Sequence, residues 1–235
     1  MYKKDIQHQF SKYSKEYNKY NIIQQIVSKA LVRELKDKPK KILELGCGSG
    51  QVFRNIDFDF VSYTALDFSQ EMCNIHPKSN NLDIKCINFD NNEFSNYLED
   101  KEFDIVLSSS ALQWSKDLAR IIKTLSKVSN KIDMVLFTSN TFKTIFTLSN
   151  KKSPILNAKN IKDSFDLYYN CTYEIINYKI EFDTKKELFN YIKNSGVGGG
   201  NSALPYKEAK YLYKNYTLNY LEFEVIFVKG VSNKN

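Results

Sequence analysis

Three glycines at alternate positions follow a short apolar run in the first quarter of the chain. The run is residues 41–45, and the glycines are Gly46, Gly48 and Gly50. Glycine lets the backbone turn sharply and approach a ligand without a Cβ atom in the way. Because a strand precedes this turn and a helix should follow it, the pattern is typical of the first crossover in a nucleotide-binding α/β sheet. Dinucleotide-binding enzymes use the spacing GxGxxG, whereas this chain has GxGxG.

Two acidic residues follow the next two predicted strands. Asp67 comes directly after 61–66, where a carboxylate can accept hydrogen bonds from both hydroxyls of an adenosine ribose. Asp90 ends the strand predicted at 84–89, where it can accept from the adenine amino group. The alternative is a purely structural glycine turn with two solvated strand ends. The order and register of the three features favour a nucleoside site.

The remaining pattern alternates short apolar runs with amphipathic stretches, as βαβ units do. Apolar residues at three- and four-residue spacing predict a helix over 5–36, which Pro39 closes. We expect strands at 41–45, 61–66, 84–89, 103–108 and 133–138, with a helix at 116–129. Their almost continuous apolar character fits a parallel sheet that helices cover on both faces.

The last third of the chain has a different pattern. Two long, aromatic-rich runs at 173–182 and 220–228 predict strands at an antiparallel edge of the same sheet. Between them we expect a helix over 184–194 that ends before Gly196, and a second helix from Pro205 to about residue 215. No linker divides the chain, so we expect one domain over 1–235.

Composition restricts the function and the location. The net charge is +7, which would attract acidic partners, although lysines spread among many Asn, Ile and Tyr also fit the drift of an AT-rich genome. Four scattered cysteines without a CxxC pair suit a reducing compartment, and two histidines make a metal site unexpected. The N-terminus lacks a signal-peptide pattern and no run is long enough to span a membrane, so we expect a cytoplasmic protein.

The segment 44–50, Glu-Leu-Gly-Cys-Gly-Ser-Gly, resembles motif I of the class I methyltransferases that use S-adenosylmethionine (SAM). The resemblance covers about 40–138 and implies a Rossmann-like α/β fold, with a seven-stranded, mostly parallel sheet and an antiparallel C-terminal strand pair. It also implies a ribose-binding role for Asp67, an adenine-side role for Asp90, and an indirect contact from Glu44 to the methionine amino group. The predicted cofactor-binding residues are Glu44, Gly46, Cys47, Gly48, Gly50, Asp67, Phe68, Asp90 and Ser108.

Three further segments resemble the malonyl-acyl carrier protein O-methyltransferases (the BioC type), which begin pimeloyl synthesis for biotin. The most specific is 107–114, which is similar to the Ser-x-x-Ala-x-Gln-Trp stretch of that family; the others are 10–17 and 137–142 with 218–220. The resemblance implies methylation of the malonyl carboxylate on an acyl carrier protein carrying malonyl-phosphopantetheine, or on malonyl-CoA. The predicted acceptor-side residues are Tyr17, Ser110, Gln113 and Trp114. On this interpretation 1–38 is a helical lid, 40–138 binds SAM, and 139–235 faces the acceptor.

Several alternatives stay open. Tyr17 belongs to an aromatic stripe that could simply pack in the core, and Trp114 could anchor the core instead of lining the acceptor site. The loop 198–203 is uncharged, whereas the family commonly carries basic residues there. Another small-molecule O- or C-methyltransferase, a tRNA or rRNA methyltransferase, and a non-catalytic scaffold are the competing functions. We do not expect nucleic acid as a partner, because neither an Asn/Asp-Pro-Pro-Tyr/Phe motif after the fourth strand nor a Pro-Cys pair is present.

Overall fold

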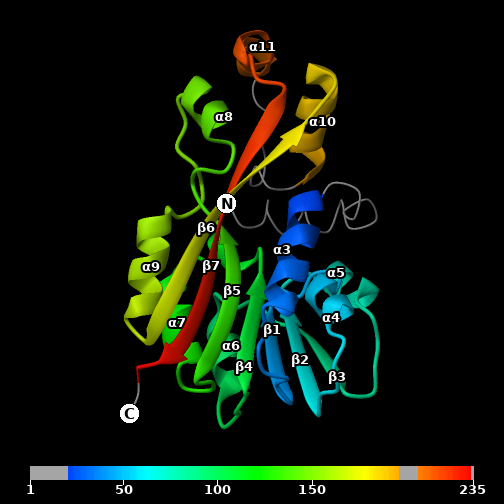
Figure 1. The fold of residues 1–235 in the computed structure, drawn as a ribbon, viewed down its shortest axis with the longest axis vertical. Coiled ribbons are helices and arrows are strands. Elements are labelled where there is room, and N and C mark those ends of the chain that lie inside the picture. The colour runs from blue at the N-terminus through cyan, green and yellow to red at the C-terminus, as the bar shows by residue number, and fades with distance from the viewer. Residues whose placement is uncertain (1–20, 196–205, 234–235) are drawn as a thin grey trace.

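A seven-stranded sheet forms the centre of the molecule (Figure 1). The structure is a computed structural model that describes residues 21–195 and 206–233. The strand order is β3-β2-β1-β4-β5-β7-β6; the first five strands are parallel, and β7 runs antiparallel to both β5 and β6. The strands are β1 Lys41–Leu45, β2 Ser62–Asp67, β3 Leu82–Cys86, β4 Ile105–Ser109, β5 Lys131–Phe137, β6 Tyr169–Glu181 and β7 Tyr220–Ser232. The prediction of a Rossmann-like, mostly parallel sheet with an antiparallel C-terminal pair is confirmed.

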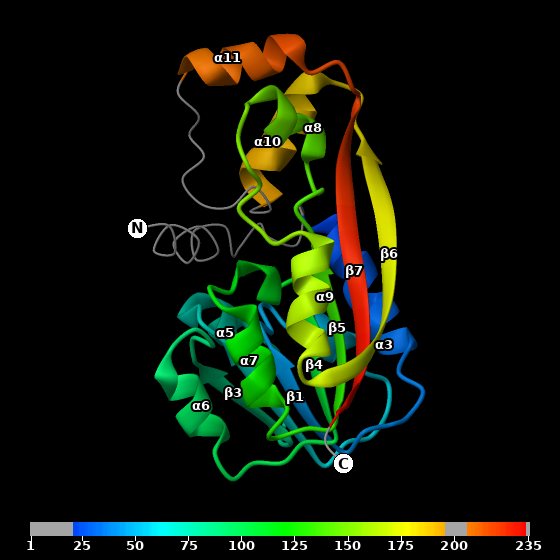
Figure 2. The same ribbon diagram turned by 90° about the vertical axis from the view of Figure 1, so that its left-hand side faces the viewer.

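Helices cover both faces of the sheet because each presents one apolar stripe to it. On one face lie α3 (Ile22–Arg33) and α4 (Gln51–Asn55), and α3 buries Ile23, Val27 and Leu31 there. On the other face lie α6 (Asn92–Leu98), α7 (Leu118–Leu125) and α9 (Ala158–Asp166), as Figure 2 shows. A short helix α5 (Gln70–Ile75) follows β2, and a single 3₁₀ turn, η1 (Leu112–Trp114), follows β4.

Several predicted boundaries are wrong, and among the strands β6 starts four residues earlier and β7 ends four residues later than expected. The helix expected over 5–36 cannot be continuous, because Asn21 leaves the helical region and α3 begins only at Ile22; residues 1–20 lie outside the described part. The helix expected at 116–129 is shorter, since the Asp117 side chain caps α7 by accepting from the Arg120 N–H (3.0 Å). The strand expected at 84–89 starts earlier and ends at Cys86.

An Asx turn explains the early end of β3. The Asn88 side chain accepts a hydrogen bond from the Asp90 N–H (2.9 Å), and its carbonyl accepts from the Asn91 N–H (3.0 Å). Asn side chains favour such turns by mimicking a backbone acceptor. Asp90 therefore sits in a turn four residues beyond β3 and does not end the strand.

The antiparallel pair extends beyond the parallel sheet and carries a small upper lobe. β5 reaches β7 only as far as the pair Phe137 and Val225, so 220–224 pair with β6 alone. Around this extension gather α8 (Lys143–Leu148), α10 (Lys185–Ser195) and α11 (Tyr206–Asn215), as Figures 1 and 2 show. The buried ring of Phe223 contacts Phe142 and Tyr191 at centroid distances of 5.0 and 6.2 Å. These contacts hold the lobe over the carboxyl ends of the parallel strands.

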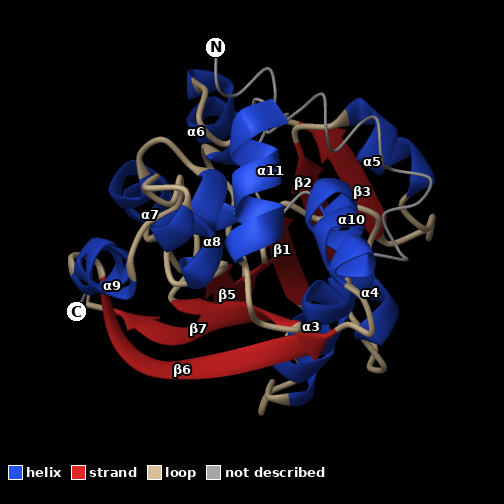
Figure 3. Cartoon of the chain, turned by 90° about the horizontal axis from the view of Figure 1, so that it is seen from above, coloured by secondary structure: helices blue, strands red, loops and turns tan. Residues whose placement is uncertain are grey.

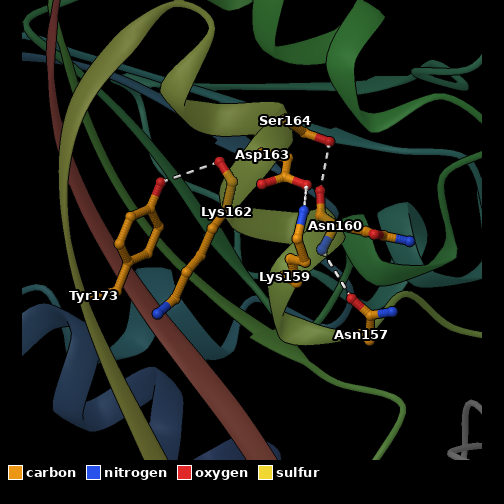
Figure 4. A network of polar contacts seen from close by, with 7 residues as sticks. All are labelled: Asn157, Lys159, Asn160, Lys162, Asp163, Ser164 and Tyr173. Atoms are coloured by element: carbon orange, nitrogen blue, oxygen red, sulfur yellow. Dashed lines mark hydrogen bonds and ion pairs between the residues drawn. The ribbon is translucent and has the colours of Figure 1, made fainter.

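Local polar contacts fix α9, which the sequence analysis did not predict (Figure 4). Asn157 caps the helix by accepting from the Asn160 N–H (2.8 Å), and Lys159 pairs with Asp163 (2.7 Å). The Tyr173 hydroxyl donates to the Lys162 carbonyl (3.3 Å) and so ties α9 to β6. Only two positions, Ile161 and Phe165, are buried along this helix, which explains its weak apolar pattern.

Candidate active site

The glycine turn lies at the carboxyl end of β1 and has two different faces. Gly46 has a φ of 68°, and a Cβ atom there would lie only 2.1 Å from the Cβ of Ala111. Gly48 has a φ of 51°, but no protein atom lies within 4 Å of the place its Cβ would take. Gly46 therefore permits close packing against the segment after β4, whereas Gly48 borders open space that a ligand can fill.

Asp67 connects the end of β2 to this turn. Its Oδ2 accepts from the Gly48 N–H (2.8 Å) and its Oδ1 from the Ser69 N–H (2.9 Å). Burial raises the pKa of this carboxyl to about 6, although the backbone donors oppose the shift. A carboxylate has about four acceptor sites, so it can accept from further donors beyond these backbone bonds.

A pocket lies at the carboxyl ends of β1, β2 and β4, beside the glycine turn. Its lining residues are Gly46, Gly48, Asp67, Phe68, Met72, Phe89, Ser109, Ser110, Ala111 and Trp114. The hydroxyls of Ser109 and Ser110 are buried and have no hydrogen-bond partner among the described residues. Buried polar atoms without partners are uncommon in proteins and are natural positions for ligand contacts.

The structure brings six of the predicted site residues together in this pocket: Gly46, Gly48, Asp67, Phe68, Ser110 and Trp114. Four residues of the lining were not among the predicted site residues. Ser109 and Ala111 were inside the quoted segment 107–114, so their position after β4 was the available signal. Met72 in α5 and Phe89 after β3 looked like ordinary core residues, and nothing in the sequence distinguished them.

The other predicted residues lie behind or beside the pocket. The Ser108 hydroxyl donates to the Leu45 carbonyl (2.9 Å) and joins β4 to β1, while Gln113 Nε2 donates to the Ser110 carbonyl (2.7 Å). Asp90 Oδ1 accepts from the Lys116 N–H (2.9 Å).

Two residues of the glycine turn, Cys47 and Gly50, are buried and do not line the pocket. Tyr17 lies outside the described residues. The binding and catalytic roles of all these residues stay predictions.

Glu44 is buried in β1 beside Tyr63 of β2, whose hydroxyl donates to its Oε2 (2.6 Å). The pKa of Glu44 rises to about 8, mainly because of burial; the hydrogen bond from Tyr63 opposes this shift, and the nearby Asp67 carboxylate adds to it. Glu44 does not line the pocket. The carboxyl therefore links β1 to β2 through Tyr63.

The raised pKa of Glu44 predicts a pH-dependent stability. The folded protein holds this proton more tightly than the unfolded chain, whose Glu titrates near 4.5, so stability falls as pH rises toward about 8. The raised pKa of Asp67, about 6, also makes stability fall as pH rises, but most of that fall occurs below about pH 6. Without ligand, the free energy of unfolding should fall by about 2 kcal/mol between pH 6 and pH 8.

Glu44→Gln should remove most of this decline, because an amide does not titrate. The exposed change Glu99→Gln should leave it intact. Chemical denaturation at several pH values measures both variants, and an unchanged decline in Glu44→Gln would contradict the assignment.

No group of three His, Cys, Asp or Glu side chains that could hold a metal ion occurs in the described ranges. Within those same ranges, no helix is both long and apolar enough to cross a bilayer.

Known proteins are similar to this chain in sequence. Residues 43–132 match the family model described as a methyltransferase domain. Two relatives named malonyl-[acyl-carrier protein] O-methyltransferase come from Bacillus cereus and Haemophilus influenzae. The first is 24% identical over 67% of this chain and 61% of its own length; the second is 25% identical over 85% and 79%. The chain thus spans about three fifths of the Bacillus cereus relative.

Solved structures share the fold. The YcgJ protein from Bacillus subtilis has a TM-score of 0.65 at 13% identity, covering 88% of this chain and 99% of that one. The plantazolicin methyltransferase BpumL in complex with SAH has a TM-score of 0.51 at 14% identity, covering 92% and 87%.

Residues 43–132 match a methyltransferase domain, and the fold and the glycine turn with its acidic partner are similar to those of class I SAM-dependent methyltransferases. SAM is therefore the cofactor. The site fits that molecule: open space borders Gly48, and the buried Asp67 carboxylate keeps acceptor sites for hydroxyl donors.

Proposed function

We propose that this methyltransferase esterifies the free carboxylate of a malonyl thioester, carried on acyl carrier protein or on coenzyme A, as the first step of pimeloyl synthesis for biotin. The observation that carries the proposal is the pair of buried hydroxyls of Ser109 and Ser110 beside Asp67, which have no partner in the described part of the chain. They lie within the segment that resembles the malonyl-carrier enzymes, and the names of the relatives support the same acceptor. We place the reaction in the cytoplasm, where the free thiols of the chain fit.

The residues of the pocket would act by positioning. When bound, SAM supplies an electrophilic methyl group, and its transfer to a carboxylate oxygen leaves an uncharged methyl ester. A carboxylic acid of this kind titrates near pH 4, so the acceptor is already ionised at neutral pH and needs no general base. This agrees with the pocket lining, where the described residues include no histidine. Orientation of the reactants alone can supply about 7–11 kcal/mol of the barrier.

Each side chain then has a defined task. Asp67 would bind the ribose hydroxyls, and the Gly48 side of the turn would leave room for the nucleoside. Ser109 and Ser110 would donate to the acceptor carboxylate, because hydroxyls donate well to anions in a site shielded from water. Gln113 would hold the Ser110 backbone in place through its amide. Trp114 would form an apolar wall of the pocket.

The test compares two carrier-bound acceptors. Purified protein with methyl-labelled SAM should transfer label to malonyl-acyl carrier protein and not to acetyl-acyl carrier protein, which lacks the free carboxylate. Equal labelling of the two carriers, or none of either, would rule out the proposed acceptor. Restored growth without biotin in a bacterium lacking its own malonyl-carrier methyltransferase would link the reaction to that pathway.

Removing the two hydroxyls should weaken acceptor binding. Hydrogen bonds to charged groups contribute about 1.5–3 kcal/mol, so Ser109→Ala with Ser110→Ala should raise KM for the malonyl acceptor at least about tenfold. The Kd for SAM should change less than about threefold on the same scale. Steady-state kinetics and calorimetry measure the two constants.

Ser115→Ala is the matched control. Its hydroxyl is also buried without a partner among the described residues, yet it lies outside the pocket lining. A similar rise of KM in Ser115→Ala would show that the effect comes from the loss of any buried hydroxyl in this segment.

A further inference from the structure

The helices of the upper lobe carry many lysines. The segment 143–152 (α8 and the loop after it), α10 and α11 together carry nine lysines against two glutamates. Residues 1–20, which lie outside the described part, carry a further excess of three positive charges. Glu181, Asp183, Glu222 and Glu224, on or beside the strand extension, offset part of the charge of these helices.

One helix of this lobe presents its lysines as a stripe. Lys207, Lys210 and Lys214 occupy positions i, i+3 and i+7 of α11, which lie on one side of an α-helix, and all three are exposed. Tyr211 lies on the same side and is 55% exposed. Leu212 of α11 and Tyr216, which directly follows the helix, are buried on the opposite side and anchor it to the protein. In the part of the chain that the structure describes, no ion pair neutralises the three lysines of the stripe.

Two other lysines fix α11 to its neighbours. Lys151 pairs with Glu208 (2.6 Å), the one acidic residue of α11, so this carboxylate is directed away from the stripe. Lys185 Nζ of α10 donates to the Tyr213 carbonyl (3.4 Å). The stripe therefore lies on a helix that contacts with Lys151 and Lys185 hold in place.

The helix that carries the stripe, α11, and the pocket lie at the same end of the sheet, the carboxyl end of the parallel strands. The pocket opens at the carboxyl ends of the parallel strands, and α11 lies beyond those ends at the top of Figure 2. Seen from above, α11 lies between α8 and α10 over the middle of the molecule (Figure 3). A macromolecule bound on this helix could direct a flexible arm toward the pocket.

We propose that the lysine stripe of α11, Lys207, Lys210 and Lys214 with Tyr211, docks the acidic surface of the acyl carrier protein that presents the acceptor. The inference rests on the proposed function and deepens it, because it assigns the carrier a place on the enzyme. A ten-residue helix is about 15 Å long, which matches a contact with one helix of a small partner. Lysines bind as point charges, and complementary charges at an interface raise the association rate and the partner specificity.

The experiment reverses the charge of the three lysines in the stripe and compares two acceptors. In the variant Lys207→Glu, Lys210→Glu, Lys214→Glu, kcat/KM for malonyl-acyl carrier protein should fall at least about tenfold. The value for malonyl-CoA, which has no protein surface to dock, should stay within about twofold. The control variant Lys36→Glu, Lys123→Glu, Lys127→Glu changes the net charge equally at exposed positions outside the lobe and should affect neither acceptor.

A second measurement separates docking from methylation. Binding of the fluorescently labelled holo-acyl carrier protein without any malonyl group should weaken with the stripe variant and not with the control variant. This result would hold even if no malonyl thioester is methylated. The proposed docking surface and the proposed acceptor can therefore be contradicted independently. Equal loss with both variants, unchanged carrier binding, or a stripe that binds a single-stranded RNA oligonucleotide more tightly than the carrier would overturn the proposal.

Discussion

Replacing Asp67 with asparagine should lower the affinity for SAM by at least about 100-fold. Hydrogen bonds to a charged carboxylate contribute about 1.5–3 kcal/mol each, and two such bonds to ribose hydroxyls account for this factor. The amide would also turn an N–H group toward the backbone donors of Gly48 or Ser69, which the carboxylate now accepts at 2.8 and 2.9 Å. Isothermal titration calorimetry measures the loss directly.

Asp83→Asn provides the control for this change. Asp83 lies on the neighbouring strand β3, is exposed and pairs with Lys85 (3.1 Å), so its replacement should leave SAM affinity within about twofold. The pH dependence offers an independent check. Because the pKa of Asp67 is raised to about 6 in the free protein, the acceptor form is lost below that pH, and affinity for SAM should fall there. Equal affinity in Asp67→Asn and the natural protein would remove the ribose-binding assignment.

Gly46→Ala should destabilise the protein by about 2–5 kcal/mol. A left-handed conformation costs a residue with a Cβ atom about 1–2 kcal/mol, and overpacking typically adds about 1–3 kcal/mol. Here the new methyl would meet the Cβ of Ala111 at 2.1 Å, so β1 or the segment after β4 must shift. Urea denaturation gives the change in the free energy of unfolding.

Gly48→Ala separates folding from binding at the same turn. Its Cβ would meet no protein atom within 4 Å, so only the backbone strain of about 1–2 kcal/mol should appear in stability. The methyl would instead occupy space needed by the nucleoside, and SAM affinity should fall at least about tenfold. A Gly48→Ala protein that binds SAM normally would show that the ligand does not approach this face of the turn.

The sequence predicted the features that depend on local pattern. The glycine turn with Asp67 has strong local signals, and the structure joins the two by the hydrogen bond from the Gly48 N–H. The prediction that a strand ends at residue 89 was wrong. The apolar side chains of Ile87 and Phe89 continue the strand pattern, although Asn88 forms an Asx turn between them. Buried apolar residues after a strand give the same pattern as residues within one.

Side-chain direction was harder to predict than backbone position. Ser108 and Ser109 are neighbours in β4, yet Ser108 donates to the Leu45 carbonyl while Ser109 lines the pocket. Alternation along a strand sends them to opposite faces, but the sequence does not say which face holds the ligand. The lobe formed by α8, α10 and α11 was also missed as a unit, because its packing around Phe223 depends on contacts between distant segments.

Titration of the natural protein with SAM, its demethylated product SAH and NAD tests the central assignment most directly. The account predicts one binding site per chain for SAM and for SAH, with no heat of binding from NAD. Saturation at a hundred times the Kd should stabilise the fold by about 2.7 kcal/mol, which a thermal shift registers independently. Heat from NAD with none from SAM or SAH would contradict the account.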